Sequence, residues 1–248
     1  MNIVLIMAKE GSFGLPGKNI WKIKDRTLLG WTITEAKASK LVDQVFVSTN
    51  GQDTAKVAKA AGAEVIMRED ELAKNEKYMD AVDHAVKAIK SKHPDLKIIA
   101  IPQCVVPFRD SDIFDRCISF LLENKTYDSA VTIRQVPFIP EAMMKIDKSG
   151  DLVPYMPDAQ SKVSGSRQDS AGYEIDHVVE CFTYNSWANR KVGIKPWDYL
   201  GRKIKGIEQH HHNHNCFVDV HTLDDIKWLE FIVDHLGFKG MLRQKGSQ

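Results

Sequence analysis

The chain has 248 residues, of which 43% are hydrophobic and 27% are charged, and its formal net charge is +1. This composition is that of an ordinary globular protein that can bury a sizeable core. The near-neutral charge excludes a global field that would attract nucleic acid or a membrane surface, so we expect neither as a partner, and any anion site must be local.

The start of the chain and its cysteines indicate the compartment. Lys9 and Glu10 interrupt the first apolar run too early for a signal peptide. No stretch approaches the ~20 apolar residues of a membrane-spanning helix. The cysteines are scattered without CxxC spacing, which argues against a disulfide framework and against structural zinc. We therefore expect a protein of the reduced cytoplasm.

Strands and helices alternate over the first half of the chain. Short apolar runs predict strands, and amphipathic or alanine-rich patterns predict helices. The predicted strands are residues 2–7, 43–48, 63–67, 96–101 and 128–134. The predicted helices are residues 28–39, 53–61, 78–91 and 111–122. This order predicts an α/β fold with a mainly parallel sheet and right-handed crossovers.

The loops that follow the predicted strands indicate where a ligand binds. Ligands of parallel sheets bind beyond the carboxyl ends of the strands. The stretches at these ends are residues 9–19, 49–51, 68–75 and 103–109. We expect them to face one shared crevice.

The first of these stretches combines Gly11, Gly14 and Gly17 with Lys9 and Lys18. Glycines let backbone N–H groups approach an oxyanion, and lysines neutralise it. The spacing matches neither a Walker loop nor the dinucleotide fingerprint G-x-G-x-x-G. A phosphate cradle and an ordinary surface loop with solvated lysines are the two interpretations.

The alternation stops near residue 136. We interpret the chain as a single domain, residues 1–248, in which residues 136–180 form an inserted subdomain. A lid, a dimerisation arm and a surface excursion are the alternatives for this proline-containing, polar insertion. Strands are predicted again at residues 177–184 and 216–221, and a last helix at residues 224–236.

Several motifs then indicate a family. Residues 8–19, AKEGSFGLPGKN, resemble the first motif of the CMP-sialic acid synthetases (acylneuraminate cytidylyltransferases), A-R-x-G-S-K-G-x-P-x-K-N. The resemblance continues in order through Gly30-Trp31, residues 47–50 and 61–65, Arg68 with residues 71–73, residues 102–103 with 107–109, and residues 218–222 with Asp225. It implies a three-layer, Rossmann-like nucleotidyltransferase fold of the GT-A-like type, and a homodimer whose inserted arm crosses to the partner. Similarity is faint between residues 136 and 215.

The resemblance also implies an activity. In a cytidylyltransferase, CTP and an acceptor give a CMP-linked product and pyrophosphate. We expect a small anionic acceptor, a nonulosonate or sialic-acid-like sugar. A phosphonate or phosphate acceptor is one alternative, and a nucleotide-binding relative without catalysis is another.

The matched motifs carry the expected site residues. For the nucleotide they are Ala8, Lys9, Gly11, Ser12, Lys18, Asn19, Arg68 and Gln103. We expect Lys18 to contact a phosphate and to act in catalysis with Asp219; a solvated lysine is the rival interpretation. The candidates for acceptor binding are Arg109, Arg167 and Gln168.

A divalent cation should bridge the phosphates, and magnesium prefers carboxylate oxygens. Asp219 is the candidate ligand, and His221 stands where the family has a second acid. Because a ring nitrogen suits magnesium poorly, manganese is an alternative to magnesium. We interpret Asp224 and Asp225 as acids that cap the last helix.

Other positions depart from the family pattern. Lys9 replaces an arginine, and Phe13 stands where the family has a lysine. The histidines at 210–212 and 214 invite a zinc hypothesis, but they lack a helical i, i+4 pattern, so a polar loop is favoured.

Overall fold

The computed structural model describes residues 1–12, 14–107, 109–136, 138–158, 172–190, 193–209 and 218–235. Within these ranges the central sheet has seven strands in the order β11-β7-β10-β6-β1-β4-β5. They are β1 (Asn2–Met7), β4 (Gln44–Thr49), β5 (Glu64–Met67), β6 (Ile98–Pro102), β7 (Ser129–Gln135), β10 (Tyr173–Thr183) and β11 (Ile204–Glu208). β10 runs antiparallel to both of its neighbours, β6 and β7, and the other pairings are parallel.

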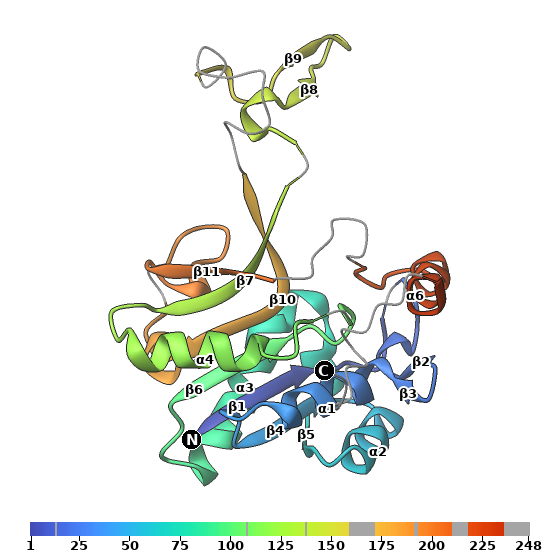
Figure 1. Cartoon of the computed structure of the whole chain (residues 1–248), viewed down its shortest axis with the longest axis vertical. Helices are drawn as coiled ribbons and strands as arrows, with labels where there is room; N and C mark the ends of the chain where they lie inside the picture. The colour runs from blue at the N-terminus through green and yellow to red at the C-terminus, as the bar shows by residue number, and fades with distance from the viewer. Residues whose placement is uncertain are drawn as a thin grey trace.

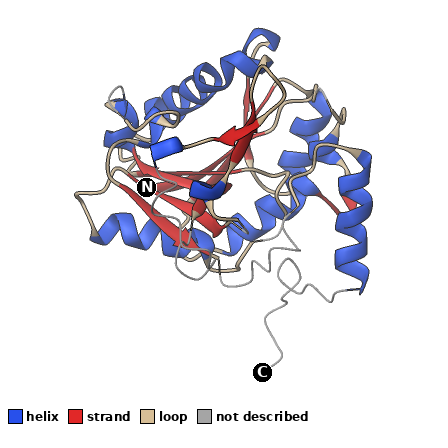
Figure 2. Cartoon of the chain, turned by 90° about the horizontal axis from the view of Figure 1, so that it is seen from above, coloured by secondary structure: helices blue, strands red, loops and turns tan. Residues whose placement is uncertain are grey.

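Helices cover both faces of the sheet (Figures 1 and 2). The helices are α1 (Leu28–Ala38), α2 (Gln52–Ala60), α3 (Tyr78–Lys92), α4 (Ile113–Glu123), α5 (Tyr184–Ala188) and α6 (Leu223–His235). Apolar side chains of α1, α2, α4 and α6 pack into one core cluster, and those of α3 and α5 pack into the other. The predicted three-layer fold with a mainly parallel sheet is confirmed. No helix in the described ranges is long and apolar enough to cross a membrane.

Local sequence explains why the central elements form. Residues 3–6 of β1 are fully buried, because β1 pairs on both sides and is covered on both faces. α1 begins after Thr27, whose Oγ1 accepts a hydrogen bond from the N–H of Gly30 at 2.9 Å. The continuous apolar run predicted β1 from the sequence, and the cap at Thr27 is a finding of the structure.

The later elements differ from the prediction. The strand predicted at 216–221 is wrong over its described part, since Val218–Val220 form no strand. Its two valines are buried in the core instead, and the N–H of Val220 donates to the carbonyl of Val105, in the segment after β6, at 2.9 Å. β11 was not predicted, because a sheet edge with a central glycine gives a weak strand pattern. β10 begins at Tyr173, inside the predicted insertion.

Shorter elements also lie within the described ranges. They are a hairpin of β2 (Lys22–Ile23) and β3 (Arg26–Thr27) and the 3-10 turns η1 (Lys18–Ile20), η2 (Asp70–Ala73), η3 (Asn75–Lys77), η4 (Pro140–Ala142) and η7 (Asp198–Leu200). β8 (Met144–Ile146) and β9 (Leu152–Pro154) form a second hairpin. Figure 1 shows this hairpin far from the sheet, at the end of a stalk made by β7 and β10. We call residues 138–158 the arm.

Candidate functional site

A crevice of about 330 Å³ lies at the carboxyl edge of the sheet. Three of the loops expected there contribute to it: the loop after β1, the segment after β5 and the segment after β6. The lining residues are Met7, Lys9, Ser12, Lys18, Asn19, Arg68, Leu72, Ala73, Lys74, Asn75, Tyr78, Ala81, Pro102, Gln103, Cys104, Val105 and His221. Cationic side chains and polar amides therefore surround one cavity.

Lys18 lies at the start of η1 and reaches across to the segment that precedes α6. η1 follows Gly17, which adopts the left-handed conformation with φ 72°, a position that favours glycine. The Nζ of Lys18 donates to the carbonyl of Val220 at 2.5 Å and lies 3.5 Å from Nδ1 of His221. Burial lowers the pKa of Lys18, and the charge of Asp219 opposes this effect. The ammonium group is thus partly desolvated, which strengthens its interaction with an anion.

Asn19 ties the first loop to the end of β6. Its Nδ2 donates to the carbonyl of Lys9 at 2.8 Å, and its Oδ1 accepts from Sγ of Cys104 at 3.0 Å. Asn19 and Cys104 are both buried, and burial raises the pKa of the Cys104 thiol to about 11. The thiol therefore stays protonated and acts as a donor that orients the amide.

Arg68 and η2–η3 form the opposite wall. The buried guanidinium of Arg68 donates to Oγ of Ser48 at 3.2 Å, and burial lowers its pKa. Nζ of Lys9 hydrogen-bonds to Oδ1 of Asn75, so the first loop meets η3 across the crevice. Tyr78, at the start of α3, lines the same wall.

Asp219 and His221 lie on the segment that precedes α6, which Lys18 contacts through the carbonyl of Val220. Oδ2 of Asp219 is 3.0 Å from Nε2 of His221, whereas Oδ1 is buried without a hydrogen-bond partner among the described residues. A carboxylate oxygen in that situation fits a cation ligand. Within the described ranges, no three His, Cys, Asp or Glu side chains converge as a metal cluster, so protein ligands from this part of the chain would be few.

Asp225 shapes that segment. Its Oδ2 accepts from the N–H groups of His221 at 2.9 Å and Thr222 at 2.7 Å, and its own N–H donates to Oγ1 of Thr222 at 3.3 Å. This reciprocal pattern is a helix-capping arrangement at the start of α6. It agrees with the interpretation of Asp225 as a capping acid.

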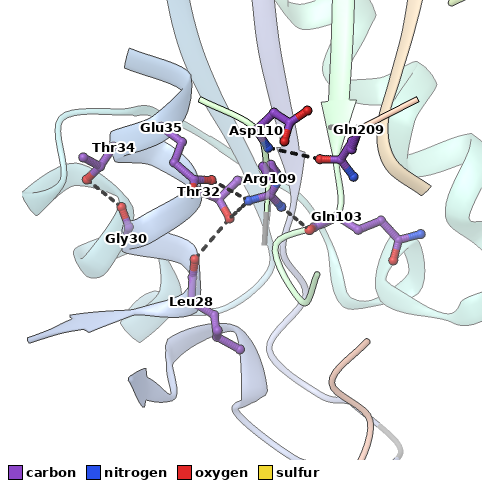
Figure 3. A network of polar contacts seen from close by, with 9 residues as sticks. All are labelled: Leu28, Gly30, Thr32, Thr34, Glu35, Gln103, Arg109, Asp110 and Gln209. Carbon is purple, nitrogen blue, oxygen red and sulfur yellow. Dashed lines mark hydrogen bonds and ion pairs between the residues drawn. The ribbon is translucent and has the colours of Figure 1, made fainter. Parts of the chain in front are cut away.

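Arg109 is not among the residues that line the crevice, and Figure 3 shows its polar contacts. Its guanidinium contacts Oε2 of Glu35 at 2.7 Å and Oγ1 of Thr32 at 3.2 Å, and it donates to the carbonyl of Gln103. In Figure 3 the side-chain amide of Gln103 extends away from Arg109. The geometry gives Arg109 a supporting position behind Gln103.

The remaining expected residues are distributed as follows. The structure brings Lys9, Ser12, Lys18, Asn19, Arg68, Gln103 and His221 together in the crevice. Ala8 is buried beneath it, with its N–H donating to the carbonyl of Ser48 at 3.0 Å, and Gly11 is exposed. Phe13, Arg167, Gln168 and the histidines at 210–212 and 214 lie outside the described residues.

Asn75 and Cys104 lie within stretches that were expected to face the crevice, but neither was named as a site residue, and Tyr78 lies outside those stretches. Cys104 follows Gln103 directly, so its place after a central strand was a usable signal. Tyr78, at the start of α3, reaches the crevice through the tertiary path of the chain after β5, which no local pattern predicts.

Comparisons with known proteins identify the family. The family described as "Cytidylyltransferase" matches residues 3–168. N-acylneuraminate cytidylyltransferase of Escherichia coli O18:K1:H7 is 30% identical over 53% of this chain and 30% of that protein. CMP-N,N'-diacetyllegionaminic acid synthase of Legionella pneumophila is 28% identical over 61% of this chain and 65% of that protein.

Solved structures share the fold. A CMP:2-keto-3-deoxy-manno-octonic acid synthetase complexed with CTP has a TM-score of 0.66 at 13% identity, covering 94% of this chain and 98% of that chain. Among the curated relatives, the chain spans only 24 to 38% of the length of the first three. The resemblance to the CMP-sialic acid synthetases is confirmed by these matches, and the chain belongs to the cytidylyltransferase family.

Proposed function

We propose that the protein transfers CMP from CTP to a small sugar acid of the nonulosonate type and releases pyrophosphate. The observation that carries this proposal is the convergence of Lys9, Lys18, Arg68 and Gln103 on one crevice. CTP is highly anionic, and displacement at its α-phosphate requires cations and aligned donors around the phosphates. The relatives named for CMP-linked sugar acids support the acceptor class.

We assign different parts of CTP to the two walls of the crevice. Lys18 and the backbone N–H groups of the first loop would neutralise the phosphates, and Lys18 is partly desolvated for that task. Arg68 and Gln103 would hold the nucleoside by hydrogen bonds. Arg109 holds the backbone carbonyl of Gln103, which fixes the point from which the Gln103 side chain enters the crevice.

Magnesium belongs to the same proposal. Asp219 would hold it through Oδ1, the oxygen that lacks a partner among the described residues, and CTP phosphates and water would complete the coordination. When bound, magnesium would neutralise charge on the phosphates. His221 is a weaker candidate, since its nitrogen is a softer ligand.

We also propose a cytoplasmic homodimer. The free thiols of Cys104, Cys117 and Cys181 support a reducing compartment. The exposed apolar side chains of the arm support an association with a second copy, because a monomer rarely leaves such side chains in water together.

The activity is tested by pyrophosphate release from CTP with N-acetylneuraminate, legionaminate and 3-deoxy-manno-octulosonate as acceptors. Turnover of one of them supports the proposal. Turnover of a phosphonate or phosphate alone would change the acceptor class. CTP binding without turnover of any acceptor would favour a non-catalytic relative, and no binding at millimolar CTP with magnesium would reject the proposal.

Variants test the roles. Lys18→Ala should weaken CTP binding by about tenfold or more in calorimetry, since a charge-assisted contact is lost. Lys87→Ala, an exposed lysine on α3, is the matched control and should bind CTP as the wild type does. Asp219→Asn should abolish magnesium-dependent turnover while the melting temperature stays unchanged, and full activity would reject the metal assignment.

A further inference from the structure

β10 contains a bulge near the end of the sheet at which the crevice lies. Its register against β7 shifts between Ile175 and Glu180. Within the bulge, His177 adopts a left-handed backbone conformation with φ 57°. This conformation is unfavourable for a residue with a Cβ. Bulges next to active sites re-aim side chains, and strain of this kind is retained where it serves a function.

The bulge lies beside the candidate site. The last residue pair between β10 and β6 is Val179 with Pro102, so the residues before Val179 run past the carboxyl end of β6, where Gln103 follows. The charge of Asp219 acts on His177, and Tyr78 interacts electrostatically with Glu180. His177 therefore stands next to the crevice on its β10 side.

Two half-buried hydrogen bonds hold the imidazole ring, one on the ring itself and one on its carboxylate partner. Nδ1 of His177 is 2.7 Å from Oε1 of Glu180, and the hydroxyl of Tyr199 donates to the same oxygen at 2.9 Å. The side chain of Glu180 is only 7% exposed, whereas that of His177 is 33% exposed. Nε2 of His177 has no hydrogen-bond partner in the described part of the chain. Nδ1 is thus held by Glu180, and Nε2 is available to a ligand.

The groups around His177 favour a protonated imidazole, and the ring of Trp197 provides an apolar surface beside it. The hydrogen bond with Glu180 raises the pKa of His177 against the effect of burial, and the charges of Asp176 and Asp219 act in the same direction. The carboxylate of Asp176 accepts hydrogen bonds from the hydroxyl of Thr132 and the N–H of Val178. The ring of Trp197 lies 6.2 Å from the imidazole between centroids. A sugar acid offers both a carboxylate and a hydrocarbon face to such a pair.

We propose that His177 binds the carboxylate of the acceptor through Nε2–H, and that Glu180 and Tyr199 are positioning residues that hold its ring. This inference rests on the proposed function. It adds an acceptor-binding residue on β10 to the candidates in the sequence motifs, of which Arg109 is engaged with Glu35 and Gln103.

The test compares Michaelis constants for the two substrates by pyrophosphate release from the full chain. His177→Gln should raise the KM for N-acetylneuraminate, legionaminate or 3-deoxy-manno-octulosonate, whichever the wild type turns over, by about tenfold or more. The KM for CTP should stay within about twofold, since the phosphate-binding residues are untouched. His177→Asn keeps a residue that tolerates the left-handed conformation and should show the same split.

Two further variants separate binding from structure. His235→Gln removes an exposed histidine at the end of α6 and should leave both constants unchanged. Glu180→Gln should raise the KM for the acceptor less than His177→Gln does, because the ring keeps a neutral partner. An acceptor KM that is unchanged in both His177 variants overturns the inference, as does a rise of both constants together. If the wild type turns over none of the acceptors, the proposed acceptor class fails and this inference fails with it.

Discussion

Arg109 shows how a motif residue can serve a site without lining it. Its guanidinium joins α1 to the end of β6 through Glu35, Thr32 and the carbonyl of Gln103. The side chain of Arg109 is 1% exposed, so these contacts are desolvated. Burial raises the pKa of Glu35 to about 7, against the opposing effect of Arg109. The pair therefore depends on both partners.

We predict that Arg109→Ala destabilises the protein by about 3–5 kcal/mol, because it leaves Glu35 buried without its counter-charge. Urea denaturation followed by circular dichroism measures this loss. The double variant Arg109→Met with Glu35→Leu should recover most of the stability. It should not recover CTP affinity, since the carbonyl of Gln103 stays unsupported. A single variant as stable as the wild type would contradict the role assigned to the pair.

Cys104 gives a second prediction at this scale. Alkylation by iodoacetamide requires the thiolate, and burial raises the pKa of Cys104 from 9.0 to about 11. At pH 8 the thiolate fraction should therefore be about a hundredfold below that of an ordinary thiol, and the rate should rise about tenfold for each pH unit up to 11. Mass spectrometry of the labelled peptide measures this, and CTP should slow it further. Labelling of Cys104 at the rate of the urea-unfolded chain would contradict the burial.

At the scale of elements, the first loop packs closely against the segment before α6. A Cβ added to Gly14 would lie 2.6 Å from the carbonyl oxygen of His221, whereas one added to Gly11 would have no atom within 4 Å. The two glycines of one loop therefore serve different purposes. Gly14 permits a close approach of two backbones, and Gly11 leaves its surroundings open.

We predict that Gly14→Ala lowers the free energy of unfolding by about 1–3 kcal/mol, because one of the two segments must move. Gly11→Ala is the matched control and should change it by less than about 0.5 kcal/mol. Thermal unfolding without nucleotide isolates this effect from any contact with CTP. Equal losses in the two variants would show that the approach of the loop to His221 is not what Gly14 provides.

The elements also show what the sequence could predict and why. β1 and β6 are buried on both faces, so their apolar runs were unambiguous, and the loops after them followed from the parallel order. Residues 218–220 alternate buried valines with Asp219 but form no strand. Val220 instead hydrogen-bonds to Val105 in the segment after β6, and this outcome is set by tertiary packing. β11 is recognisable only once β7 is there to pair with it. For the site, the motif predicted the lysines of the first loop. The positions of Tyr78 and His177 depend instead on tertiary packing of segments that are far from that loop in the sequence.

At the scale of the whole molecule, the exposed apolar side chains of the arm are the feature least expected of a monomer. Its hairpin stands away from the sheet on the stalk of β7 and β10 (Figure 1). Ile146 and Leu152 face each other across the β8–β9 pairing and are 72% and 69% exposed. A hairpin of two three-residue strands has no core of its own, and isolated two-stranded hairpins are marginally stable in water. Burial of these side chains against a second copy would supply the missing apolar contact.

We therefore predict that the wild type sediments as a dimer at micromolar concentration and that Ile146→Glu with Leu152→Glu shifts it to monomer. Placing carboxylates in an apolar interface costs several kcal/mol, which is enough to raise a micromolar dissociation constant more than a hundredfold. Ile194→Glu, at an apolar side chain that is 53% exposed outside the arm, is the control and should remain dimeric. Sedimentation equilibrium measures the three proteins. A dimer that survives both arm substitutions would place the interface elsewhere, and a monomeric wild type at tens of micromolar would reject the homodimer. Because Ile146 and Leu152 lie away from the crevice, the monomeric variant should still bind CTP, which separates assembly from nucleotide recognition.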